Sequence, residues 1–259
     1  MMNIRQYTNI TEIVIPNRIK LSNNSFLDTF RNMRNLVTSD FNHPSVANMV
    51  QTYWNCSNLT SSPVCGDKVT SMSYTYANCY NLTGNPVCGD KVTSMYEAYS
   101  YCTNLTGSPV CGNNVTKMYR TYHGCYNLTG SPVCGEKVTN ISSAYRNCCN
   151  LTGSPVCGNN VTNMDSAYRN CTNLNAGTFY FYAKNISNAS YCFAGKNNSR
   201  RYNIHVPANS KTLKTFIINN TQSLVGKAIT WTTTTDVNGV ITRYYNATYN
   251  ICIFVNTSM

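Results

Sequence analysis

The sequence predicts an α/β solenoid, in which about eight coils of 23 residues stack side by side and each contributes a parallel strand and a short helix or 3₁₀ turn. The main observation is a motif of Cys, a variable residue, Asn and Leu that recurs every 23 residues from Cys56 to Cys171. A Pro-Val-Cys-Gly segment follows each of the first five copies. The third observation is composition, because only 11% of the residues are charged and neutral polar residues are abundant instead.

Each repeat carries the same apolar positions, which define the expected core. The Cys-x-Asn-Leu motifs begin at Cys56, Cys79, Cys102, Cys125, Cys148 and Cys171. Later in each repeat come a Val, a Met or Ile three positions on, and a Tyr four positions after that; the tyrosines are Tyr76, Tyr99, Tyr122, Tyr145 and Tyr168. The spacing from Met to Tyr to Cys places three apolar side chains on one face of a short helix. The segment before the proline is expected to be extended, because proline disfavours helix at the preceding residue.

Repeat length and composition exclude other architectures. Twenty-three residues are too few for a helical-pair repeat or a propeller blade. The chain lacks the Glu, Lys, Leu and Ala content of a coiled coil and the regular glycine of collagen. Its many aromatic residues do not fit simple disorder. Degenerate copies extend the array upstream at Phe26 and Val46 and downstream at Ile186 and Phe193, so we expect atypical end coils.

The period stops after about residue 195, and we divide the chain accordingly. Residues 1–45 are expected to form an N-terminal cap with a degenerate first repeat, 46–195 the solenoid, and 196–259 a small C-terminal cap or attachment module of α+β or all-β type. In this last part we expect strands at 204–207, 228–231, 240–245 and 249–255, a turn at 236–239, and a helix whose buried face consists of Leu213, Phe216, Ile217 and Leu224.

The order of Leu, Pro, Val-Thr, Met or Ile, an aromatic residue and Cys resembles the repeat of the BspA-like leucine-rich-repeat surface proteins over about residues 20–195. The resemblance implies a leucine-rich-repeat-type stack and a role as an adhesin or as a surface or virion protein. Family members exported by bacteria carry a signal sequence and often an anchor, and the first residues here contain no apolar stretch of that kind. The strand, helix and Tyr-rich hairpin expected at the end are similar to the ends of such proteins encoded by bacteriophages.

Cysteine occupies two columns of the repeat, and we interpret both as packed thiols. The first column is Cys56, Cys79, Cys102, Cys125, Cys148 and Cys171, and the second is Cys65, Cys88, Cys111, Cys134 and Cys157. Disulfides between column neighbours are the alternative, since these would lie about one strand spacing apart; a reducing compartment argues against them. No close Cys pair of zinc-site type occurs, so we expect no metal and no other cofactor.

One further column consists of formal glycosylation sequons of sequence Asn-Leu-Thr. These begin at Asn58, Asn81, Asn104, Asn127 and Asn150. Neighbouring members of the column would be about 5 Å apart, which is too close for adjacent glycans. We therefore expect a ladder of amide hydrogen bonds at this position.

No catalytic motif occurs in the sequence, and we expect a protein that is not an enzyme. Nucleophile-elbow, zinc-protease and phosphate-loop motifs are all lacking. His123 lies two residues from Cys125, but Cys125 falls in a core column and a reactive thiol needs partial exposure. A glycan-degrading enzyme would need paired carboxylates. The acidic column of Asp67, Asp90 and Glu136 instead suggests a solvated edge.

Tyrosines outside the core pattern are the candidate ligand-binding residues, because tyrosine offers a large contact area at low entropic cost. They are Tyr80, Tyr96, Tyr119 and Tyr126. The net charge of +11 predicts a basic face as well. Its candidate residues are Arg146, Arg169, Arg200 and Arg201. The alternative for both sets is a solvated surface that keeps a charge-poor protein soluble.

Together these features predict a non-enzymatic surface protein of a bacteriophage virion: a fibre, decoration or host-adhesion component. Such a protein is made in the host cytoplasm and needs no export signal. The expected partners are other virion proteins or further copies of the chain, and a host surface glycan or protein; a nucleic-acid partner and a membrane span are not expected. A secreted bacterial cell-surface adhesin is the main alternative, and a virion-associated glycan-degrading enzyme the lesser one.

Overall fold

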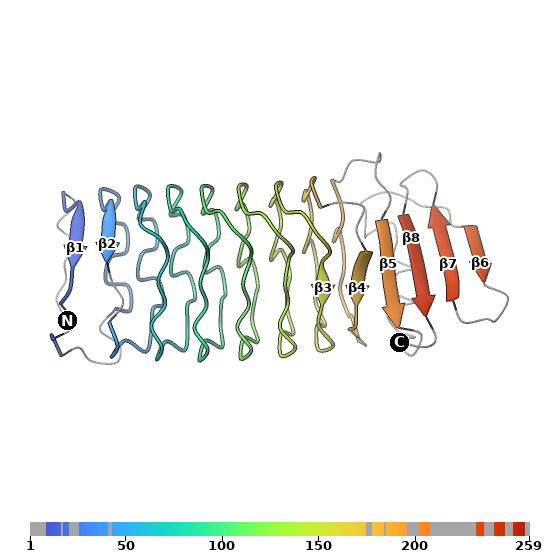
Figure 1. The fold of residues 1–259 in the computed structure, drawn as a ribbon, viewed down its shortest axis with the longest axis horizontal. Coiled ribbons are helices and arrows are strands. Elements are labelled where there is room, and N and C mark those ends of the chain that lie inside the picture. Colours follow the sequence, from blue (N-terminus) through green and yellow to red (C-terminus); the bar gives the residue numbers. More distant parts are fainter. Residues whose placement is uncertain are drawn as a thin grey trace.

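The computed structural model describes residues 9–16, 18–20, 26–40, 43–174, 178–183, 185–195, 202–207, 232–235, 241–246 and 251–256. In it, successive repeats lie side by side along one long axis (Figure 1). We call one repeat in this stack a coil. Parallel bridges join the equivalent residue of each coil to the next, and they connect Asn48, Ser71, Ser94, Lys117, Asn140, Asn163 and Asn188 in that order.

Each coil turns through a run of tight turns rather than through a continuous helix. After the bridge residue, alternate N–H groups donate within the coil and to the next coil: Thr75 donates to the Met72 carbonyl at 3.0 Å, and Tyr74 to the Tyr96 carbonyl at 2.8 Å. Tyr74 and Asn78 have φ values of 57° and 62°. A left-handed residue ends a helix because its carbonyl points away from the helix axis. Among the described residues there is consequently no helix; of the expected short helix or 3₁₀ turn, the coils have single i→i−3 turns.

The core is a set of columns that run the length of the stack. The six repeat tyrosines are at most 2% exposed, and these are Tyr53, Tyr76, Tyr99, Tyr122, Tyr145 and Tyr168. Neighbouring rings are stacked with centroids 5.2–5.7 Å apart. Ile186 and Phe193 are buried in the same core, as are Phe26 and Phe30 at the other end. The atypical end repeats therefore continue the apolar columns.

Eight strands are assigned in the described part of the chain, and they lie toward its two ends. At the N-terminal end, β1 (Glu12–Val14) pairs in parallel with β2 (Thr38–Asp40). The others are β3 (Val156–Cys157), β4 (Thr178–Phe181), β5 (Tyr202–Pro207), β6 (Thr232–Thr235), β7 (Ile241–Asn246) and β8 (Ile251–Asn256). They form one sheet in the order β3-β4-β5-β8-β7-β6 (Figure 1).

This sheet joins the repeats to the C-terminal residues. Strands β3, β4, β5 and β8 are parallel to one another. At the far edge, β7 pairs antiparallel with β8, and β6 pairs antiparallel with β7. The C-terminal strands β5 to β8 thus continue, edge to edge, the sheet that begins in the repeats. The expected strand at 228–231, the turn at 236–239 and the helix containing Leu213 lie outside the described residues; β6 begins directly after that predicted strand.

Polar ladders join the outer edges of the coils. In the sequon column, the Asn81 amide donates to Asn58 at 3.5 Å and the Asn104 amide to Asn81 at 3.4 Å. The expected amide ladder is therefore confirmed, with long hydrogen bonds. Neutral side chains suit such columns, because like charges stacked at coil spacing would repel one another.

Candidate functional site

Four aromatic side chains form a continuous row across four coils, which we call the aromatic strip. Its members are Trp54, Tyr74, Tyr96 and Tyr119. The ring centroids follow one another at 5.7, 5.2 and 4.9 Å. All four side chains are half-buried, so each presents part of its ring to solvent. Contiguous aromatic surface of this kind is typical of recognition sites.

The turn segment of each coil positions the strip. It follows a buried methionine, such as Met72 or Met95, and contains a buried core tyrosine a few residues later. Between these two core residues the chain also has less buried positions, and the strip residues occupy them. Tyr74 has a left-handed backbone conformation, with φ of 57°, and this turns its side chain toward Tyr96 of the next coil.

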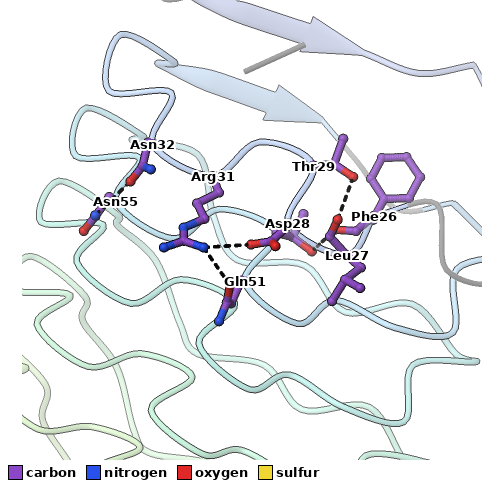
Figure 2. Close-up of polar contacts among 9 residues, drawn as sticks. Phe26, Leu27, Asp28, Thr29, Arg31, Asn32, Gln51 and Asn55 are labelled. Atoms are coloured by element: carbon purple, nitrogen blue, oxygen red, sulfur yellow. Dashed lines mark hydrogen bonds and ion pairs between the residues drawn. The ribbon is translucent and has the colours of Figure 1, made fainter. Parts of the chain in front are cut away.

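An arginine lies at each end of the strip. The Arg31 guanidinium lies 3.9 Å from the ring centroid of Trp54, close enough for a cation–π contact. As Figure 2 shows, Arg31 also contacts Asp28 at 3.5 Å and the Gln51 side chain at 3.2 Å. These contacts hold the guanidinium in place at the first end.

At the other end, Arg120 lies 5.8 Å from the Tyr119 ring centroid and 3.6 Å from Glu97. Burial raises the pKa of Glu97, and the nearby Arg120 opposes this rise. Since each terminal arginine is paired with a carboxylate, the strip offers mainly aromatic surface with little net charge.

A second cluster adjoins the strip at His123. The Arg120 Nε donates to His123 Nδ1 at 3.2 Å, and the Tyr101 and His123 ring centroids are 4.8 Å apart. His123 is only 2% exposed. Burial, and then Arg120 and Arg146, lower the pKa of His123 to about 4. The imidazole is therefore neutral at physiological pH and accepts a hydrogen bond from Arg120.

Two members of the predicted basic face are described, and one of them, Arg146, lies near His123. Arg146 and Arg169 are half-buried, and Arg169 lies 5.4 Å from the Tyr191 ring centroid. The pKa of Asp165 is raised by burial, and the positive charges of Arg146 and Arg169 limit this rise. A carboxylate near the two arginines reduces the charge that this surface offers to an anion. Arg200 and Arg201 lie outside the described residues.

The predicted tyrosines fall into two separate groups. Tyr96 and Tyr119 belong to the aromatic strip, whereas Tyr80 and Tyr126 are 46% and 42% exposed and occupy a different column. Thr103 occupies the coil between Tyr80 and Tyr126, so their rings are not adjacent. Sequence reasoning missed Trp54 as a site residue. Its offset to Tyr74 is 20 residues rather than 23, so column alignment does not show the pair.

The environment of Cys125 does not favour its acting as a nucleophile beside His123. Cys125 is fully buried and its thiol donates to the Tyr99 carbonyl at 3.0 Å. Burial also raises the pKa of this thiol far above its usual range. The acidic column is exposed along one edge, as the sequence indicated, and consists of Asp67, Asp90 and Glu136.

Comparisons with protein-family models, curated proteins and solved structures give no match to this chain. Within the described ranges, no helix is long and apolar enough to cross a membrane. The arguments about function below therefore depend on the geometry of the strip and on the resemblance of the repeat.

The variant His123→Gln should lose less folding stability than the parent when the pH is lowered. The pKa of His123 is about 4 in the fold and 6.5 as a free side chain. Between these values the unfolded chain binds the proton more readily, so stability falls as pH drops from 6.5 toward 4. Urea titrations of both proteins at pH 7, 5.5 and 4.5 measure this difference. Parallel curves for parent and H123Q would contradict the prediction.

Proposed function

We propose that this chain is a non-enzymatic binding protein on the surface of a bacteriophage particle, built as a leucine-rich-repeat-type solenoid. The observation that carries the binding role is the aromatic strip from Trp54 to Tyr119, which presents four rings in contact with one another along the stack. The resemblance of the repeat and of the C-terminal segment supports the virion setting.

A stack of near-identical coils suits such a role. Every coil is tied to its neighbours by backbone hydrogen bonds and by buried tyrosine stacking, as for Tyr99 between Tyr76 and Tyr122. Residues on its surface are thereby held at fixed spacing. A ligand that contacts several coils then loses little of its binding free energy to ordering the protein.

Removing two rings of the strip should weaken adhesion. We expect the double variant Tyr96→Ser and Tyr119→Ser to bind host cells at least about tenfold more weakly, because about 1.4 kcal/mol of lost contact corresponds to a factor of ten. The matched control is Tyr80→Ser with Tyr126→Ser, which removes two exposed rings outside the strip. Fluorescent protein titrated onto host cells measures the affinity, and circular dichroism confirms folding. Loss of binding in the control alone would overturn the assignment to the strip.

The virion setting has its own test. Mass spectrometry of purified particles should detect peptides of this chain, together with the virion proteins to which it is attached. Absence from particles, combined with recovery from the envelope of uninfected bacteria, would overturn the virion proposal in favour of a bacterial surface adhesin. Subunit contacts found by cross-linking within particles would identify its partners there, whether other virion proteins or further copies of the chain.

A further inference from the structure

The second cysteine column lies along an accessible edge of the stack, and we call it the outer column. It consists of Cys65, Cys88, Cys111, Cys134 and Cys157, and the first four are half-buried rather than buried. The other column, from Cys56 to Cys171, is fully buried and is the inner column. The sequence predicts packed thiols in both columns, whereas in the structure the two columns differ in solvent exposure.

The thiols of the two columns also differ in their hydrogen bonding. Inner-column thiols donate to a carbonyl of a neighbouring coil, as in the contact of 3.0 Å from Cys102 to Tyr76. The Cys88 and Cys111 thiols of the outer column donate only weakly, at 3.7 Å, to the carbonyl of the residue that follows each of them, and the Cys111 sulfur also accepts from the Gly135 N–H at 3.3 Å. The outer thiols are consequently the ones that can bind a ligand without breaking a strong internal hydrogen bond.

The Cys65, Cys88 and Cys111 sulfurs of the outer column lie close to the backbone of the next coil. The Gly135 N–H donates to the Cys111 sulfur of the preceding coil at 3.3 Å. A Cβ added at Gly112 or Gly135 would lie 2.9 or 3.1 Å from the sulfur of the preceding coil, so the sulfur lies close to these glycines. From the regular repeat we infer that successive sulfurs are separated by one coil spacing, which is about 4.8 Å for paired strands.

A hollow opens onto this column. Its volume is about 520 Å³, and its lining includes the thiols Cys111 and Cys134 together with Asn113, Glu136 and Lys137. An ion from solvent can therefore reach two successive thiols without unfolding of a coil.

We propose that the outer column binds soft monovalent metal ions of the Cu(I) and Ag(I) type, each held linearly between two thiolates of successive coils. Thiolate is the ligand that selects Cu(I). Two metal–sulfur bonds of about 2.3 Å each, the length known for zinc–thiolate, span about 4.6 Å, which matches the coil spacing. Two thiols each lose a proton and one cation binds, so the site gains one negative charge; Lys137 and Glu136 both line the hollow beside it.

The same geometry argues against zinc. Structural zinc requires four ligands in a tetrahedral arrangement, and no group of three or more His, Cys, Asp or Glu suited to a metal is found among the described residues. Motif spacing does not indicate this site, because its ligands are 23 residues apart, whereas familiar metal motifs place ligands two to four residues apart.

Metal binding should strengthen as pH rises. Each thiol ligand must release its proton when the metal binds, so the affinity should be higher at pH 8.5 than at pH 6.5.

The test uses the reduced full-length protein under argon, with Ag⁺ as the probe. Native mass spectrometry counts the bound ions, and ultraviolet thiolate-to-metal absorption follows the titration. The double variant Cys111→Ser and Cys134→Ser should bind one ion fewer than the parent. Cys65→Ser with Cys88→Ser should also lose one ion, which keeps the test valid if either variant fails to fold. The matched control is Cys149→Ser, a half-buried thiol outside both columns, and it should bind as many ions as the parent.

Two results would overturn the proposal. One is a full complement of ions in both double variants, since the metal would then bind elsewhere. The other is binding of Zn²⁺ with the same stoichiometry and affinity as Ag⁺, because a linear pair of thiolates does not satisfy zinc. Adhesion is not part of this measurement, so its outcome is independent of the function proposed above.

Discussion

Replacing Tyr122 with alanine should lower the free energy of unfolding by about 3–5 kcal/mol, the cost typical of removing a buried aromatic side chain. Tyr122 is 0% exposed and stacks between Tyr99 and Tyr145, with both centroid distances 5.6 Å. Its hydroxyl donates to the Val110 carbonyl at 2.8 Å and accepts from the Val110 N–H at 3.1 Å. The substitution therefore leaves a cavity and removes the partner of two backbone groups.

Tyr126 provides the matched control, because it lies in the same coil and is 42% exposed. We expect Tyr126→Ala to change stability by no more than about 0.5 kcal/mol, as is usual for surface substitutions. Urea titrations followed by far-ultraviolet circular dichroism measure both variants. Equal effects of the two substitutions would contradict the assignment of the buried tyrosine column.

Deleting one whole repeat should be less damaging than deleting half of one. Removal of residues 92–114 joins Lys91 to Val115 and leaves every column in register, so the protein should fold with one coil fewer. Removal of residues 92–102 takes away fewer residues but eliminates the inward-facing half of a coil. The five buried hydrophobic side chains that it removes are Val92, Met95, Ala98, Tyr99 and Cys102.

The half-coil deletion should not fold, because the loss of five buried side chains exceeds the total stability of about 5–15 kcal/mol that domains of this kind have. The neighbouring coils also lose the hydrogen bonds that the deleted segment makes to Tyr119 and Thr121. Circular dichroism, thermal melts and limited proteolysis distinguish the outcomes. A stably folded half-coil deletion, or an unfolded whole-coil deletion, would contradict the stacked architecture.

Much of the core could be predicted from the sequence, down to individual columns. The Val, Met, Tyr and Cys positions of each repeat are buried as their periodicity indicates, and Ile186 and Phe193 continue them. The turn conformation could not be predicted in this way. The spacing from Met72 to Tyr76 to Cys79 fits a helix as well as it fits a run of turns, and left-handed residues such as Tyr74 decide between them.

The candidate sites were harder to derive. Tyr96 and Tyr119 align in one column and were identified, but Trp54 and Tyr74 join them through offsets of 20 and 22 residues. Those offsets depend on how far each turn projects its side chain across the coil. The helix predicted around Leu213 and the basic residues Arg200 and Arg201 lie outside the described residues and remain predictions.

The repeat, its length and the inward columns follow from the amino-acid sequence alone, because a residue that recurs every 23 positions meets the same neighbours in every coil. Which outward side chains touch becomes apparent only in the folded chain. There the aromatic rings form one strip, and one cysteine column is half-exposed while the other is buried. The physical reason is that burial follows from periodicity along the chain, whereas contacts across the surface depend on the backbone conformation of the turns between the columns.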